Sequence, residues 1–479
     1  MRRSVSTPLV SWFACAGCGA SPDLSDPYPF RCPNAQRDGD VDHVLRRELD
    51  VSAVRFPADP EPNPFVRYRG LLHAYHQATA AGLSDDDFCR LVGRLDRQVA
   101  AVAGHGFTAT SFARNDALSD RLGFSPRGGV WVKDEAGNVS GSHKARHLFG
   151  VLIHLEVTEC LGWTDASARP DLAIASCGNA ALAAAVLAAA GRWVLQVFVP
   201  PEADSAVLAR LEELGARIMV CRRTGHGAGD PTYHHLLRAL DDGALPFTCQ
   251  GNLNGLAVEG GETLGYEIVS DLLAAGATLD RLVVQVGGGA LASACSKALQ
   301  EAVQLGALGA APRLDTVQTT GAWPLRRAFE AVVARLDDAG PPGEALRYAA
   351  RHRSEFMWPW EQKPRSIAHG ILDDETYDWL AVVEGMIRSG GRPLVVDERT
   401  LELAHVVARE TTGIDVDPTG SAGLAGLIAL RHTGGVDDDE RVGLLFTGIT
   451  RSHQSEREEW RDEELSRPRH PVAQGLRAK

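Results

Sequence analysis

Short apolar runs alternate with helical segments along most of the chain. Residues 171–200 contain an apolar run, a small-residue turn, an alanine-rich helix ended by Gly191 and a second apolar run. This order predicts a parallel strand–helix–strand unit. Residues 206–215 and 217–221 continue the alternation as a helix and a strand. The pattern therefore predicts an α/β fold, whereas residues 51–125 show mainly helical periodicity.

The turn of the first unit, Ser176-Cys177-Gly178-Asn179, lies where a strand is expected to end and a helix to begin. Free backbone N–H groups and the helix dipole make such a turn a cradle for an anion, and an amino acid carboxylate would fit it. Alternatively, the serine and the asparagine simply cap the helix.

A second junction, in residues 130–149, contains Lys144. An apolar strand runs through a polar turn into an apolar helix that starts near this lysine. A lysine held at the start of a packed helix can lose its charge by desolvation, and a neutral amine is what an imine with an aldehyde cofactor requires. An ordinary solvated lysine is the alternative.

A third junction carries three consecutive glycines, Gly287, Gly288 and Gly289, between an apolar strand and a helix. Such glycines let the backbone approach a phosphate closely, although a plain tight turn is the alternative. The pattern also fits a loose dinucleotide motif that ends at Ala292. That motif requires an acidic residue after the next strand, and residues 315–320 end in threonines instead.

Composition narrows the class of protein. The 479 residues suffice for two to three domains with substantial cores, and the net charge of −13 provides no basic face for a nucleic acid. No apolar run approaches the roughly 20 residues of a membrane span. Six cysteines are scattered singly after residue 88, as in reduced proteins, so we expect a cytoplasmic protein.

The N-terminal cysteines form a separate pattern. Cys15 and Cys18 have the spacing of a zinc knuckle, whereas Cys32 lacks the second cysteine of its own knuckle. His43 or Asp38 is a candidate for the fourth ligand. We keep two interpretations, a structural zinc site and a degenerate remnant without metal.

Taken together, these motifs resemble the fold type II pyridoxal-phosphate enzymes, the tryptophan synthase β-like group that includes threonine synthases and serine/threonine ammonia-lyases. The resemblance spans roughly residues 60–455 and depends on Lys144, Asn179 and the glycine loop, which occur in the family's order. Residues 414–426 and 442–448 resemble the family's late helix start and final strand.

The resemblance implies two open, twisted, mainly parallel sheets flanked by helices, together with a small cysteine-containing N-terminal segment. We expect an N-terminal segment (residues 1–50), a large cofactor-binding domain (51–164 and 256–455), a small βαβ domain (165–255) and a charged tail (456–479). We also expect a homodimer.

The resemblance also implies roles for individual residues. Lys144 would hold pyridoxal phosphate as an imine and act as the base at Cα, and Thr447 would meet the ring nitrogen. Asn179 would touch the cofactor's 3′ oxygen. The phosphate would be bound by the glycine loop and the start of the next helix, Gly287, Gly288, Gly289, Ala290 and Leu291. The substrate carboxylate would be bound by the turn Ser176, Cys177, Gly178, Asn179 and Ala180.

These roles imply β-elimination or β/γ-replacement on a small L-amino acid through an aminoacrylate-type intermediate, as in an ammonia-lyase or a threonine synthase. His143 and Ala145 depart from the relatives' usual residues beside the lysine. Two alternatives stay open, a non-catalytic binding or regulatory protein, which His143 and His147 favour, and a dinucleotide-dependent oxidoreductase, which the loose dinucleotide motif favours. Residues 324–391, long and rich in charge and tryptophan, would shape a substrate pocket or an interface, or would simply pack against the rest of the fold.

Overall fold

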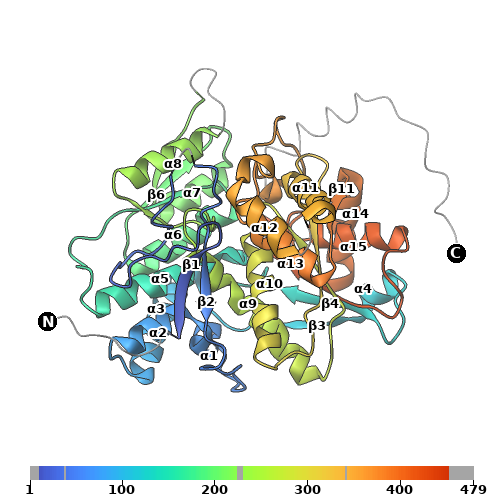
Figure 1. Ribbon diagram of the computed structural model, residues 1–479, viewed down its shortest axis with the longest axis horizontal. Coiled ribbons are helices and arrows are strands. Elements are labelled where there is room, and N and C mark those ends of the chain that lie inside the picture. The colour runs from blue at the N-terminus through green and yellow to red at the C-terminus, as the bar shows by residue number, and fades with distance from the viewer. Residues whose placement is uncertain (1–9, 37–38, 224–229, 340–341, 452–479) are drawn as a thin grey trace.

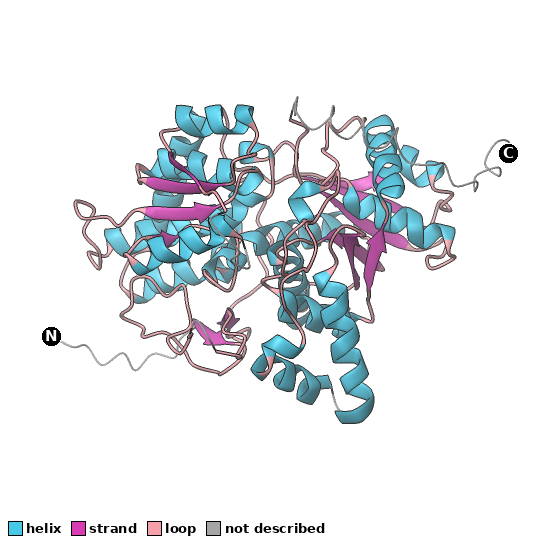
Figure 2. Ribbon diagram, turned by 90° about the horizontal axis from the view of Figure 1, so that it is seen from above, coloured by secondary structure: helices cyan, strands magenta, loops and turns pink. Residues whose placement is uncertain are grey.

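A computed structural model describes residues 10–36, 39–223, 230–339 and 342–451. Two sheet units lie side by side, each with helices around it (Figures 1 and 2). The expected fold class, two mainly parallel sheets flanked by helices and a cysteine-containing N-terminal segment, is confirmed. The predicted charged tail and Asp38 lie outside the described residues.

The larger sheet has six strands. Their order is β11 (Pro393–Val396), β10 (Arg313–Thr319), β9 (Arg281–Gln285), β12 (Arg441–Phe446), β4 (Gly129–Asp134) and β3 (Phe112–Asn115). All neighbours are parallel except β3 and β4. Most of these strands read as continuous apolar runs because helices cover both faces of the sheet.

The helices on one face of this sheet are α9 (Leu256–Ala275), α10 (Ala290–Gln304), α11 (Pro324–Ala339), α12 (Pro342–Arg351) and α13 (Trp379–Ser389). Those on the other face are α4 (Asp116–Arg121), α14 (Glu398–Thr412) and α15 (Ala422–His432). The two apolar layers, one on each side of the sheet, hold the strand ends in fixed positions.

The smaller sheet has four parallel strands, in the order β7 (Arg217–Val220), β6 (Leu195–Val199), β5 (Leu172–Ala175) and β8 (Leu245–Pro246). The helices of this unit are α5 (Lys144–Cys160), α6 (Asn179–Gly191), α7 (Ser205–Glu213) and α8 (Pro231–Asp241). The predicted strand–helix–strand unit is confirmed as β5, α6 and β6. The division of the chain into domains at residues 164 and 255 remains a prediction.

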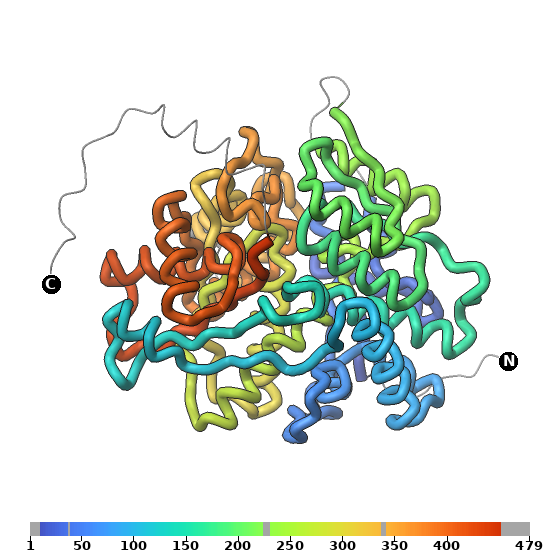
Figure 3. Tube along the Cα trace, turned by 180° about the vertical axis from the view of Figure 1, so that it is seen from behind, coloured from blue at the N-terminus to red at the C-terminus, as the bar shows by residue number. Residues whose placement is uncertain are grey.

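The N-terminal segment forms a two-stranded antiparallel sheet, β1 (Ser11–Cys15) with β2 (Leu45–Leu49). Helices α1 (Pro64–Arg67), α2 (His73–Ala80) and α3 (Asp85–Ala103) follow. The chain then crosses to the larger sheet along β3 (Figure 3). Helical periodicity over residues 51–125 missed this strand, because four residues at a sheet edge show little alternation.

Helices α5 and α9 pack closely enough to require glycine at the contact. A β-carbon at Gly150 would lie 2.9 Å from the Cα of Gly260, and one at Gly261 would lie 2.2 Å from Cε1 of His147. This contact fixes the start of α5, where Lys144 lies. None of the helices in the described part of the chain is long and apolar enough to span a membrane.

Candidate active site

The candidate site lies where β9 and β12 end as neighbours in the larger sheet. Gly287, Gly288 and Gly289 follow β9 and lead into α10, while Thr447 follows β12. Parallel neighbours end at the same edge of a sheet, so the structure brings the glycine loop and Thr447 together.

Gln285, the last residue of β9, fixes the hydroxyl of Thr447. The two hydrogens of its Nε2 are shared among three acceptors, Thr447 Oγ1 at 2.8 Å and the carbonyl oxygens of Gly420 and Leu445 at 2.9 and 3.0 Å. The hydroxyl oxygen therefore acts as an acceptor here, and its own proton remains available for a further acceptor. Sequence reasoning missed Gln285, although a polar residue at the end of an otherwise apolar strand was the signal.

Lys144, half-buried, is the first residue of α5. Just before it, Ser142 forms a β-bridge with Gly448, and the backbone N–H of His143 donates to the carbonyl oxygen of Thr447 over 3.2 Å. The polar turn predicted around Lys144 thus leads this lysine to the carboxyl end of β12.

A buried ion network holds the first turn of α5. The guanidinium of Arg146 donates to Glu135 over 2.8 Å and to Glu267 over 2.7 Å, and Lys133 Nζ lies 2.6 Å from Glu267. The four side chains are almost completely buried, and the charge of Arg146 contributes to a lowered pKa of Glu267 despite its burial. Paired charges of this kind are costly to break. The network therefore positions α5 against β4 and α9.

The two histidines near Lys144, His143 and His147, are buried, and one ring nitrogen of each lies against a backbone carbonyl. The ring of His143 lies with Nδ1 3.2 Å from the carbonyl oxygen of Thr447, and Nδ1 of His147 lies 2.8 Å from that of Ala257. Burial lowers the pKa of both rings, to about 3 for His147. Both are therefore neutral at physiological pH.

Asn179 begins α6 and belongs to the smaller sheet unit, yet it reaches the end of β12. A β-carbon at Gly448 would lie 2.8 Å from its Nδ2. The guanidinium of Arg451 donates both to Asn179 Oδ1 and to the carbonyl oxygen of Ser140. Because an arginine can only donate, this contact orients the amide so that Nδ2 remains the donor on the other side.

The predicted carboxylate turn lies at the start of α6 and is open to solvent. Cys177 is exposed, and Ser176, Gly178 and Ala180 are half-buried. The N–H of Gly178 donates to Ser176 Oγ over 3.4 Å, and α6 shows no side-chain cap. The first N–H groups of this helix therefore have no partner within the helix and face outward.

A segment within residues 324–391, for which the sequence left packing and a pocket wall as alternatives, covers the glycine loop. A β-carbon at Gly287 would lie 2.5 Å from Asp373 Oδ2, and one at Gly288 would lie 3.0 Å from the ring of Tyr377. Gly289 has a φ of 97°, which L side chains rarely adopt. Only glycines permit this approach, and residues 373–378 form one wall of the site.

Two carboxyls of this segment lie within the electrostatic reach of Lys144. Burial raises the pKa of Asp373 to about 6, against the opposing charge of Lys144, and this carboxyl accepts the backbone N–H of Gly288. Burial likewise raises the pKa of Asp378 to about 7. Both groups therefore titrate near neutral pH, as is common in active sites.

The loop fits a phosphate group. Ala290 and Leu291 open a helix of 15 residues, so their N–H groups have no partner within the helix and the dipole favours an anion. The Thr447 proton is available to a ring nitrogen on the same sheet edge. One donor, the N–H of Gly288, is occupied by Asp373, so a phosphate would meet a carboxyl there.

Cys15, at the end of β1, lies close to Cys18 and Cys32 in the connection between β1 and β2. The tryptophan-rich part of residues 324–391 packs on itself, with the guanidinium of Arg327 4.2 Å from the ring of Trp358.

Comparison with known proteins identifies the family of this chain. A family model for pyridoxal-phosphate dependent enzymes matches residues 105–448. The threonine synthase of Methanocaldococcus jannaschii is 26% identical over 346 residues, which are 71% of this chain and 74% of that protein. The threonine synthase of Mycobacterium tuberculosis is 27% identical over 326 residues, 67% of this chain and 76% of that protein.

Solved structures share the fold at lower identity. Diaminopropionate ammonia lyase from Escherichia coli aligns with a TM-score of 0.56 and 16% identity, over 78% of this chain and 91% of that one. Threonine deaminase isoform 2 from Solanum lycopersicum aligns with a TM-score of 0.55 and 16% identity, over 81% of this chain and 95% of that one. With the family match over most of its length, the chain belongs to the pyridoxal-phosphate-dependent enzymes of fold type II.

Proposed function

We propose that the protein catalyses β-elimination or β/γ-replacement on a small L-amino acid and is a pyridoxal-phosphate-dependent lyase. The family match and the threonine synthase relatives support this class of reaction. The structural neighbours include a serine ammonia-lyase and serine racemases, and at their low identity they bear on the fold alone.

The observation that carries the proposal is the hydroxyl of Thr447, held by Gln285 at the end of β12. When bound, pyridoxal phosphate supplies an aldehyde for the substrate amine and an electron sink for charge at Cα. A hydroxyl beside the ring nitrogen, unlike a carboxylate, does not stabilise a proton there, and this weakens the sink. Loss of a side-chain substituent is then favoured over transamination.

In this proposal, Lys144 would hold the cofactor through its aldehyde, and the free amine of this lysine would take up the proton from Cα. The backbone of residues 287–291 would hold the phosphate, and Asn179 Nδ2 would be a donor for the cofactor's 3′ oxygen. The turn at residues 176–180 holds the substrate carboxylate through the outward N–H groups of α6. The protein as a whole would act as a homodimer in the cytoplasm, with the domain boundaries predicted from the sequence.

A screen of substrates tests the proposal. The purified protein, loaded with pyridoxal phosphate, is incubated with β- and γ-substituted amino acids, and ammonia, keto acid, replacement product and the D-enantiomer are measured. We expect elimination or replacement with at least one substrate, lowered about 10²–10⁴-fold by Lys144→Ala. Racemisation as the main reaction would contradict the proposal.

Cofactor binding is measured separately by visible absorption. We expect an absorption band from the lysine-bound cofactor in the wild type and none in Lys144→Ala. A wild-type protein that takes up no pyridoxal phosphate would refute Lys144 as its attachment point.

A binding or regulatory protein without turnover is the second candidate. The Asp373 carboxyl at the N–H of Gly288 favours it, because an ionised carboxylate at the loop opposes a phosphate. Conversion of no substrate in the screen, together with weak uptake of pyridoxal phosphate, would support this candidate.

A further inference from the structure

We propose that Cys15, Cys18, Cys32 and His43 bind one Zn²⁺ ion, which has a structural role and is distinct from the cofactor site. The sequence left the fourth ligand and the presence of metal open. The structure supplies a histidine that completes the set.

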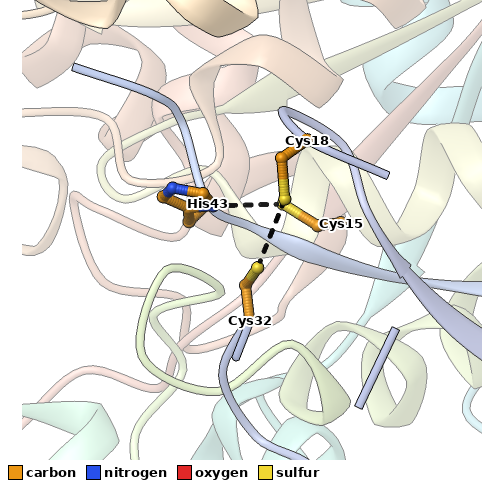
Figure 4. Close-up of side chains that lie close together, drawn as sticks. All are labelled: Cys15, Cys18, Cys32 and His43. Carbon is orange, nitrogen blue, oxygen red and sulfur yellow. Dashed lines mark hydrogen bonds between the residues drawn. The ribbon is translucent and has the colours of Figure 1, made fainter. Parts of the chain in front are cut away.

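The four side chains lie close enough together to surround one ion. Their ligand atoms all lie within 4.8 Å of one another. Cys15 Sγ lies 3.5 Å from His43 Nδ1, and Cys18 Sγ lies 3.5 Å from Cys32 Sγ (Figure 4). Zinc–ligand bonds of about 2.0–2.3 Å place neighbouring ligand atoms of a tetrahedron about 3.3–3.8 Å apart, so an ion fits with small adjustments.

Backbone donors around the sulfurs form a second, independent observation. Cys15 accepts the N–H of Cys18, and Cys18 accepts that of Ala20. Cys32 accepts the N–H of Asn34 over 3.4 Å. N–H groups turned toward all three sulfurs stabilise negative charge on them, which is the form in which cysteine binds zinc.

The location indicates what the ion does. Cys15 ends β1 and His43 lies two residues before β2, so the ion would close the long connection between these strands at both ends. That connection joins other parts of the fold, since Phe30 accepts the N–H of Gly255 over 2.9 Å. A set of four protein ligands leaves no open position for a substrate, as in structural zinc sites.

The test measures metal in the full-length protein loaded with pyridoxal phosphate. We expect about one zinc per chain, and after exchange with Co²⁺ the absorption of tetrahedral thiolate coordination. Cys18→Ser and His43→Ala should lose most of the zinc, whereas the control Cys160→Ser, which removes an exposed cysteine elsewhere, should retain it. Cys18 is itself exposed, so its replacement leaves the core intact.

Cofactor uptake distinguishes this proposal from the proposed function. The lysine-bound absorption band should persist in Cys18→Ser, with a lower midpoint of thermal unfolding than in Cys160→Ser. Less than a tenth of a zinc per chain after loading under reducing conditions would overturn the site. A Cys18–Cys32 disulfide that survives those conditions would overturn it as well.

Discussion

The hydroxyl of Thr447 accepts a hydrogen bond from one amide, that of Gln285, and in the proposed function its own proton would face the cofactor ring. The residue type at this position matters because a hydroxyl and a carboxylate favour opposite protonation states of a ring nitrogen. The chemistry of the site is in this respect decided by a single side chain.

Replacing this hydroxyl tests its role. In Thr447→Asp we expect the rate of elimination or replacement to fall at least about tenfold, which corresponds to ~1.4 kcal/mol in the barrier, while half-transamination increases. Product analysis by chromatography measures both. Thr447→Ser, which keeps a hydroxyl, serves as the control, and an unchanged product ratio in the aspartate variant would contradict the assignment.

Asp373 is the carboxyl that would oppose a phosphate at the proposed site, because it accepts the backbone N–H of Gly288. Its pKa, raised by burial to about 6, means that the carboxyl is neutral below that pH and anionic above it. In Asp373→Asn we expect pyridoxal phosphate to bind about fivefold more tightly than in the wild type at pH 8, from a repulsion of ~1 kcal/mol, and about equally at pH 5.

Fluorescence titration of the two proteins across this range measures the ratio of their Kd values. The ionisation of the cofactor's own phosphate affects both proteins equally, so it cancels in the ratio of the Kd values. Asp59→Asn, on an exposed residue, is the control. A ratio that is independent of pH would show that Asp373 does not act on the bound phosphate.

At the scale of elements, the α5–α9 contact holds Lys144 at the sheet edge. In Gly261→Ala the new methyl group would collide with the ring of His147, 2.2 Å away. We expect the free energy of unfolding to fall by about 1–3 kcal/mol, together with weaker cofactor binding, because the start of α5 must shift.

Chemical denaturation and cofactor titration measure these effects. Gly93→Ala is the matched control, since Gly93 lies inside α3 and a β-carbon there would meet only the flexible Arg97 at 3.6 Å. We expect this variant to be as stable as the wild type or more stable by up to ~1 kcal/mol. An equal loss of stability in both variants would show that alanine acts on the helix that contains it rather than on the α5–α9 contact.

At the scale of the whole molecule, Arg451 connects the two sheet units. It donates to Asn179 at the start of α6 and to the carbonyl oxygen of Ser140 in the turn that leads to Lys144. A planar guanidinium can make both contacts at once, whereas a lysine ammonium is a poor substitute.

We expect Arg451→Ala to raise the Kd for pyridoxal phosphate about tenfold, because the Asn179 amide loses its orientation and a charged hydrogen bond contributes ~1.5–3 kcal/mol. Arg451→Lys should restore little of this affinity. Equilibrium titration measures both variants, with Arg388→Ala on the exposed face of α13 as the control. A Kd for pyridoxal phosphate in Arg451→Ala equal to that of the wild type would show that this residue does not contribute to cofactor binding.

The sequence by itself determined the order of the elements and the chemistry at the strand ends. Apolar runs, glycine turns and helical periodicity are local, so they predicted β4, α5, β5, α6, β9 and α10. Each cofactor motif also stands at a junction between elements, where a short stretch of sequence suffices to recognise it. The edge strand β3 was missed because its pairing partner, rather than its own pattern, makes it a strand.

Only the tertiary structure decided which distant residues meet at those junctions. Asp373 over the glycine loop, Arg451 on Asn179, and His43 beside Cys15 are separated from their partners by up to hundreds of residues. No local pattern specifies such contacts, because they depend on the order of strands in the sheet and on the packing of helices across it. The sequence thus located the chemical groups, and packing determined their surroundings and hence their charge states.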